Sequence, residues 1–231
     1  MKQYADTHKL FGDLTGAVIS IQVYTLYLIV FMFLAEASSD AQWFQADPIL
    51  KIFPKQATLW SSIVLSLAML LLWCGIQHPT KDIIFKSFKH SAYGLTAAII
   101  LILTMRLIVG PNMPTFIPPE ESVKPGYLLG MSAGFSEELI FRLGLTPLIF
   151  ISSLKYMQVH YAGIFTILVV ALLFALLHEI GSAGEAFSAY YFMARFIVPG
   201  CIMGLAFFYI SPTFIVMMHC TAHIMIPLLF L

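Results

Sequence analysis

The run "HYAGIFTILVVALLFALLH", residues 160–178, contains no Asp, Glu, Lys or Arg. A helix rises about 1.5 Å per residue, so about 20 apolar residues cross the ~30 Å hydrocarbon core of a bilayer. The whole chain has the same character, since 60% of its 231 residues are hydrophobic, 10% are charged and its mean hydropathy is +0.89. This composition predicts an integral membrane protein with several spans.

Further apolar runs of similar length lie on both sides of this one, separated by polar or Pro/Gly-rich segments such as the basic "QHPTKDIIFKSFKH". The predicted spans are 14–35, 57–76, 91–109, 127–149, 160–178, 187–210 and 213–231. We therefore expect an all-α, polytopic membrane helical bundle of about seven transmembrane helices, or eight. It forms a single domain over 1–231, with three N-terminal helices and a loop in 1–126 and a core in 127–231.

The lysines of the connecting segments predict the orientation, because positive charge collects on the cytoplasmic side. With the amino terminus inside, the inner set exceeds the outer one: Lys2, Lys9, Lys81, Lys86, Lys89 and Lys155 against Lys51, Lys55 and Lys124. A cytoplasmic amino terminus is therefore favoured. Twelve Lys/Arg balance twelve Asp/Glu, so no nucleic-acid partner is indicated, and the three cysteines lie in or beside apolar runs, where a disulfide framework is not expected.

Three ionisable residues lie inside the fourth apolar run, in "SEELIFR", residues 136–142. A charged side chain at the bilayer centre costs about 2.5–3.5 kcal/mol, so such groups face partners or water inside a bundle. Glu138 and Arg142 have the i, i+4 spacing of a helical salt bridge, which is the structural interpretation. This pairing gives Glu137 no partner. Its carboxyl group is either held protonated by burial and by its like-charged neighbour or kept ionised by another donor.

Three histidines of later runs are the candidate donors. His178 ends "FALLH", while His219 and His223 in "HCTAH" are four residues apart and share one face of a helix. A lone membrane histidine is more often a helix-packing hydrogen bonder, but three of them with a twin glutamate favour a common site. In the predicted orientation they meet Glu137 in the outer half of the bundle.

A carboxylate beside imidazoles can take a proton from water and stabilise a developing oxyanion, which is the chemistry of water-driven peptide hydrolysis. A metal site is the nearest alternative, because His219 and His223 with Glu137 or Glu138 make a three-ligand zinc set, although the sequence H-E-x-x-H is absent. A serine nucleophile is disfavoured, since no G-x-S-x-G surrounds the nearby hydroxyls Ser132, Ser136 and Thr221.

These motifs resemble those of the CPBP family, which includes the CAAX prenyl endopeptidases and the Abi proteins. "EELIFR" is similar to its EExxxR motif, "FALLH" to FxxxH and "HCTAH" to HxxxN. The resemblance covers about residues 127–227 and includes a helix with the family's Arg, Gly, Gly and Tyr, here Arg195, Gly200, Gly204 and Tyr209.

The resemblance implies a glutamic intramembrane endopeptidase that needs no cofactor, with zinc as the alternative. It implies Glu137 as the general base, His178 as the residue that binds the water, His219 as an oxyanion donor, and Glu138 with Arg142 as a supporting ion pair. His223 replaces the usual Asn, and a neutral imidazole still donates one N–H. The implied partners are the lipid bilayer and a membrane-anchored, lipidated or secreted peptide substrate, in a bacterial inner membrane.

A non-enzymatic membrane binding protein or transporter is the alternative of another class, with the same glutamates and histidines forming a proton or cation path. The chain shows no inverted repeat and no matched pair of broken helices, which argues against transport. Cleavage and a new amino terminus distinguish a peptidase from such a protein.

Overall fold

The computed structural model describes residues 4, 6–35, 55–109, 134, 137–181 and 189–230, and these are helical wherever they form regular structure, with no strand among them. The α-helices are α1 (Thr7–Ala35), α3 (Lys55–Ile76), α4 (Lys81–Val109), α6 (Thr146–Ser153), α7 (Val159–Gly181), α8 (Ala189–Phe192), α9 (Val198–Tyr209) and α10 (Pro212–Phe230). Two π-helices, η4 (Glu138–Leu145) and η5 (Met193–Ile197), run directly into α6 and α9. The all-helical prediction is confirmed for these residues.

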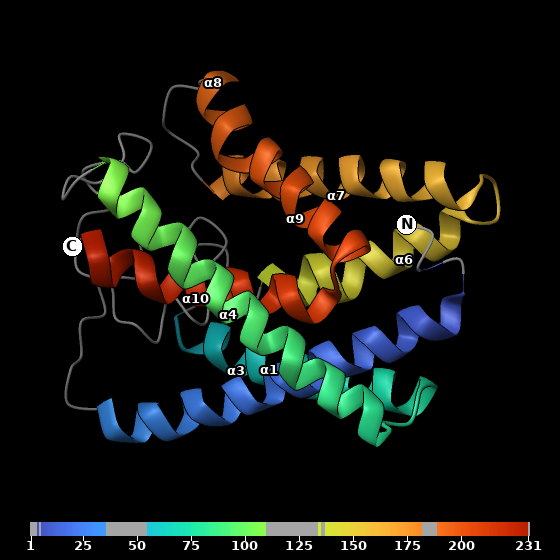
Figure 1. Ribbon diagram of the computed structural model, residues 1–231, viewed down its shortest axis with the longest axis horizontal. Coiled ribbons are helices and arrows are strands. Elements are labelled where there is room, and N and C mark those ends of the chain that lie inside the picture. The colour runs from blue at the N-terminus through green and yellow to red at the C-terminus, as the bar shows by residue number, and fades with distance from the viewer. Residues whose placement is uncertain are drawn as a thin grey trace.

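The helices alternate in direction, as expected for a chain that crosses a layer repeatedly. In Figure 1, α1, α4, α7 and α10 begin toward the right of the view, while α3, α6 and α9 end there. Short connections join them on this side, including the turn between α6 and α7 at 154–158. The beginnings of α1, α4 and α10 are therefore at the same end of the bundle, which we call the lysine end because it carries Lys9, Lys81, Lys86, Lys89 and Lys155.

Two of the described helical segments are long and apolar enough to cross a membrane, Lys81–Ile108 and Val159–His178. Val64–Ile76 and Val198–Tyr209 are shorter apolar helices. Large apolar side chains point outward from these helices, with Leu71 76%, Leu107 85% and Ile108 79% exposed. Such surfaces suit contact with lipid rather than water. The prediction of seven spans stays a prediction.

Helix α4 begins ten residues earlier than the predicted span at 91, so the basic segment expected to be a connection is helical. Thr80 caps this start, because its Oγ1 accepts a hydrogen bond from the Ile83 N–H at 3.3 Å. Asp82 in the first turn also suits the positive end of the helix dipole. These local signals outweigh the charge of the three lysines between 81 and 89.

Helices α4 and α10 cross in close contact at Gly94. A Cβ atom at this position would lie 2.3 Å from the Phe214 carbonyl oxygen and 3.0 Å from the Met217 Cβ, so only glycine permits the approach. Helix α9 packs on α7 in the same way, where Gly200 faces Ala171 and Gly204 faces Ile167, each with 3.0 Å to an added Cβ. Helices α7 and α10 in turn pack against η4.

Candidate functional site

The π-helix η4 begins at Glu138, directly after Glu137, and a proline just beyond its end explains its form. Pro147 occupies the first turn of α6. In a continuous α-helix its ring would clash with the Leu143 carbonyl four residues earlier, and its missing N–H would leave that carbonyl unpaired. The wider π-helix shifts the bonds by one residue, and Phe141 O accepts from both the Thr146 N–H and, at 2.7 Å, the Thr146 hydroxyl.

The same arrangement recurs in η5, which ends at Ile197, two residues before Pro199. Single π-helical turns inside α-helices are rare and occur frequently at functional sites. Here η4 and η5 are both packed against α7. The two widened segments therefore face the helix that carries His178.

Glu137, Glu138 and Arg142 are all buried, with 3%, 1% and 1% of their surface exposed. Glu138 lies 3.9 Å from Arg142, measured from Oε1 to Nε, so the predicted i, i+4 ion pair is present but wide. The direct partner of Glu138 is instead His219, whose Nδ1 lies 2.7 Å from the same Oε1. The sequence did not predict this contact, because it joins η4 to α10, which lie far apart in the chain.

Three imidazoles surround the carboxylate of Glu137. His178 on α7 directs Nε2 at Oε1 over 3.5 Å. On the other side, His219 and His223 of α10 direct Nε2 at Oε2 over 3.6 and 4.0 Å. The predicted set of one glutamate and three histidines is thus brought together from three helices.

Hydrogen bonds fix which imidazole nitrogen carries the proton in the neutral rings. His178 Nδ1 lies 2.8 Å from the Phe174 carbonyl, which can only accept, so Nδ1 donates and the Nε2 lone pair faces Glu137. His219 Nδ1 likewise donates to the Glu138 carboxylate, so its Nε2 is an acceptor. His223 Nε2 lies 3.1 Å from His219 Nε2, and must be the donor of that pair.

Aromatic rings hold His178 in position. Its ring centroid lies 4.4 Å from that of Phe174 and 4.7 Å from that of Phe196. The Phe174 carbonyl fixes the ring orientation, since it accepts from Nδ1. Contacts of this kind to a functional histidine set both its tautomer and its direction.

Arg142 is enclosed by groups that leave part of its hydrogen-bonding capacity unused. Its guanidinium lies 5.6 Å above the ring of Phe174, and Nη2 donates to the Met203 sulfur at 3.6 Å. Its Nε and Nη1, and Glu138 Oε2, have no hydrogen-bond partner among the described residues. Buried groups of this kind normally have partners, so these three atoms are exceptions within the cluster.

Glu137, His219 and His223 could also hold a metal ion, because one ligand atom from each lies within 4.8 Å of the others. Zinc bonds of about 2.0–2.1 Å in a tetrahedron place ligand atoms roughly 3.4 Å apart. The observed separations of 3.1, 3.6 and 4.0 Å bracket that value. The residues therefore fit the predicted zinc alternative as well as a metal-free site.

Several residues named from the sequence do not belong to this cluster. Tyr209 is 55% exposed, and Gly200 and Gly204 serve the packing of α9 on α7. Arg195 lies in η5, but its side chain is outside the described part of the structure. Conversely, sequence reasoning missed Met203 and Gly134; the latter lies where an added Cβ would be 3.1 Å from the His223 ring.

Part of the chain matches a known protein family. The family model described as type II CAAX prenyl endopeptidase Rce1-like matches residues 119–226, slightly less than half of the 231 residues. This segment contains η4, α7, η5, α9 and nearly all of α10, and hence every residue of the cluster. Searches of curated proteins and of solved structures give no match.

Proposed function

We propose that this protein is an intramembrane glutamic endopeptidase, because residues 119–226 match the model of the Rce1-like type II CAAX prenyl endopeptidases. The observation that carries the proposal is the buried Glu137 carboxylate with imidazoles on both of its oxygens. Its substrate is a membrane-anchored or prenylated protein or peptide cut near its anchor.

Glu137 acts as the general base. The Nε2 lone pair of His178 and the carboxylate of Glu137 are acceptors that face each other across 3.5 Å, so a water molecule beside them can donate one hydrogen to each. Glu137 takes a proton from this water while the water oxygen attacks the peptide carbonyl carbon. The same carboxyl group then returns the proton to the leaving amide nitrogen, and the C–N bond breaks.

His223 supplies the hydrogen bond to the oxyanion. Its Nε2–H is the donor toward His219, whereas the proton of neutral His219 is directed at Glu138. A tetrahedral oxyanion beside Glu137 would accept the His223 N–H and gain the stabilisation that such donors provide. This modifies the role expected from the resemblance, where His219 is the donor, and it gives His223 the function of the usual Asn.

Glu138 positions His219 rather than acting on the substrate. Its short contact to His219 Nδ1 fixes that ring and leaves Nε2 directed at Glu137 and His223. Arg142 compensates the second buried carboxylate from 3.9 Å. The twin glutamates therefore have separate tasks, a base and an orienting group.

A zinc-dependent mechanism is the second candidate, favoured by the triangle of Glu137, His219 and His223. In that case these three residues hold the ion, which supplies a polarised water when bound. Glu138 keeps its orienting role, since it contacts the other nitrogen of His219. The two mechanisms differ in their response to metal removal.

The test is cleavage of a prenylated peptide by the full chain reconstituted in lipid vesicles, read by mass spectrometry of the new amino terminus. Glu137→Gln and His178→Ala are compared with wild type, with and without a zinc chelator. Asp13→Asn is the matched control, because it makes the same chemical change outside the cluster.

The glutamic mechanism predicts that both site variants lose cleavage, that Asp13→Asn keeps it, and that the chelator has no effect. Cleavage that is lost on chelation and restored by added zinc indicates the zinc-dependent mechanism instead. Cleavage by Glu137→Gln at the wild-type rate contradicts both. A protein that binds or transports yields no new amino terminus with any substrate.

A further inference from the structure

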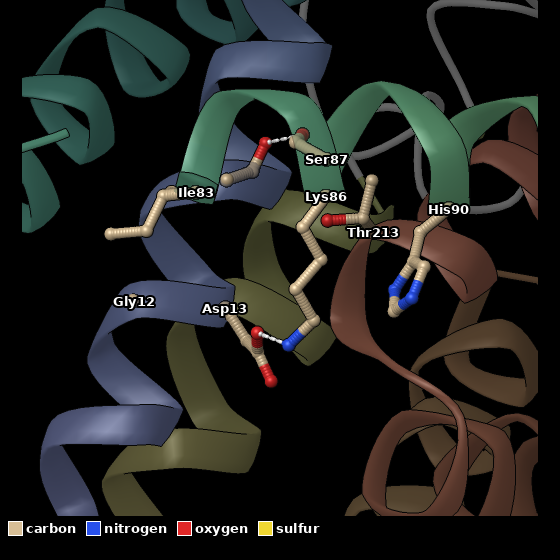
Figure 2. A pocket seen from close by; sticks show the side chains of 8 residues that line it. Gly12, Asp13, Ile83, Lys86, Ser87, His90 and Thr213 are labelled. Atoms are coloured by element: carbon tan, nitrogen blue, oxygen red, sulfur yellow. Dashed lines mark hydrogen bonds and ion pairs between the residues drawn. The ribbon is translucent and has the colours of Figure 1, made fainter. Parts of the chain in front are cut away.

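A second group of polar residues lies away from the Glu137 cluster, in a pocket between α1, α4 and α10 (Figure 2). The pocket is small, with a cavity volume of about 10 Å³, and it opens to the outside. Its lining residues are Gly12, Asp13, Gly16, Ile83, Lys86, Ser87, His90 and Thr213. Neither the proposed reaction nor the family motifs use these residues.

One side of the pocket is an ion pair between Asp13 and Lys86, whose carboxylate and ammonium are in direct contact. The Tyr4 hydroxyl donates to the other carboxylate oxygen, Asp13 Oδ2, at 3.0 Å. Both oxygens of Asp13 are therefore occupied. Asp13 thus positions the ammonium group of Lys86 at the pocket.

The cation itself keeps donors for a further partner. An ammonium group has three N–H donors, and one is directed at Asp13. The Lys86 side chain is 42% exposed, in contrast to 9% for Asp13. His90 lies one helical turn further along α4. Figure 2 shows its side chain beside that of Lys86, with Thr213 of α10 between them. An ammonium, an imidazole and a hydroxyl thus converge on one opening.

Close contacts and hydrogen bonds join α1 and α4 beside this opening. An added Cβ on Gly16 of α1 would lie 3.3 Å from the Ser87 Cβ of α4, so the two backbones approach closely. Ser87 donates to the Gly16 carbonyl and shares a 2.6 Å hydrogen bond with Ser20, which Ser91 also contacts at 2.9 Å. Such interhelical hydrogen bonds keep the pocket in shape when it is empty.

In a bilayer that α4 crosses from end to end, the pocket lies near the lipid headgroups. The apolar segment Lys81–Ile108 has 28 residues. At 1.5 Å per residue this is about 42 Å, the full thickness of a bilayer with its polar layers. Lys86, about 7.5 Å from the start, is then close to the boundary of the hydrocarbon, and its chain reaches back toward the phosphate layer.

Charge around the opening favours an anion. The lysine end carries five described lysines but only three described acidic residues, Asp6, Asp13 and Asp82. Basic pockets between transmembrane helices are recognised binding places for anionic headgroups. An acidic protein partner would need a broader exposed surface than this small pocket offers.

We propose that the pocket formed by Lys86, His90 and Thr213, with Asp13 holding Lys86, binds a phosphate group. The phosphate belongs either to a lipid headgroup or to a free phosphate ion. Lys86 donates a charge-assisted hydrogen bond to it, and His90 and Thr213 complete the contacts. A bound headgroup would tie α1, α4 and α10 together at the lysine end, independently of cleavage at Glu137.

The test is native mass spectrometry of the full chain in detergent, titrated with phosphatidylglycerol or with diacylglycerol, which lacks the phosphate. Wild type should retain phosphatidylglycerol over diacylglycerol. Lys86→Gln should weaken retention roughly tenfold, the effect of losing one hydrogen bond to a charged group. Lys86→Arg should restore it, and Glu137→Gln should bind like wild type.

Lys155→Gln is the matched control, since Lys155 is exposed at the lysine end outside the pocket. Equal losses in Lys86→Gln and Lys155→Gln, or no loss in Lys86→Gln, overturn the proposal. Thr213→Val leaves the Asp13 to Lys86 pair intact, so it decides the outcome if Lys86→Gln does not fold: weaker retention supports the site and unchanged retention contradicts it. Displacement of the lipid by millimolar inorganic phosphate identifies free phosphate as the ligand, and failure to displace it identifies the headgroup.

Discussion

This protein has two pairs of an acidic and a basic side chain that differ in exposure and in the distance between their charged groups. Asp13 and Lys86 touch each other at the lysine end, where the Lys86 side chain is 42% exposed. Glu138 and Arg142, both 1% exposed, stand 3.9 Å apart, because Glu138 instead contacts His219. The geometry of the buried pair is therefore not set by the attraction between Glu138 and Arg142. The Glu138 carboxylate orients the His219 imidazole, and the Arg142 cation compensates the charge of that carboxylate.

The largest effect on stability is expected from Arg142→Met, which keeps an apolar chain of similar reach but removes the charge. Glu138 then lies buried without its compensating cation, and breaking such a pair costs about 3–5 kcal/mol. The measurement is the free energy of unfolding in mixed detergent micelles. Wild-type stability in this variant would show that His219 alone compensates Glu138, and that the wide pair contributes nothing.

His223→Ala is expected to lower kcat about 10²–10³-fold, the cost of removing one oxyanion donor. His223→Asn restores an N–H donor at the position where the family has Asn, so it should retain activity within about tenfold of wild type. Single-turnover cleavage rates for both variants check this. Equal and complete loss in the two would instead favour His223 as a metal ligand.

Gly94→Ala tests how the two regions are joined, since α4 carries Lys86 and α10 carries His219. An added Cβ would lie 2.3 Å from the Phe214 carbonyl oxygen, so the helices must separate. Overpacking of this kind costs about 1–3 kcal/mol. Gly75→Ala is the control, because an added Cβ there meets no atom within 4 Å among the described residues. Similar stability changes in both would contradict the close α4 to α10 contact.

The smallest effect is expected from Lys86→Met, because a partly exposed ion pair contributes about 0–1 kcal/mol. The free energy of unfolding in lipid-free detergent should therefore change little, and peptide cleavage should stay at the wild-type rate. A loss as large as that of Arg142→Met would remove the distinction between the two pairs.

The positions of the helices were predictable, because an apolar run of the right length and a polar break are local properties of the chain. The runs ending in His178 and containing His219 correspond to α7 and α10. The span predicted from residue 91 begins ten residues after the start of α4, because the basic residues before 91 are not apolar, although Thr80 caps a helix there. Span count, membrane orientation and the division at residue 126 stay predictions.

The composition of the cluster was predictable from spacing and resemblance, but its contacts were not. The i, i+4 rule linked Glu138 to Arg142, whereas the structure links Glu138 most closely to His219. That contact depends on how η4 packs against α10, which no local pattern encodes. The π-helices were also missed, although Pro147 and Pro199, each two residues past a π-helix, were a readable signal.

Single-turnover cleavage by Glu137→Gln and Glu138→Gln distinguishes the base from the orienting group among the twin glutamates. Both changes replace a buried carboxylate by an amide in η4 or directly before it. Loss of the base predicts a rate about 10²–10⁴-fold lower for Glu137→Gln. Loss of an orienting partner predicts about 10–100-fold for Glu138→Gln. A rate for Glu138→Gln as low as that for Glu137→Gln, or lower, would contradict this assignment.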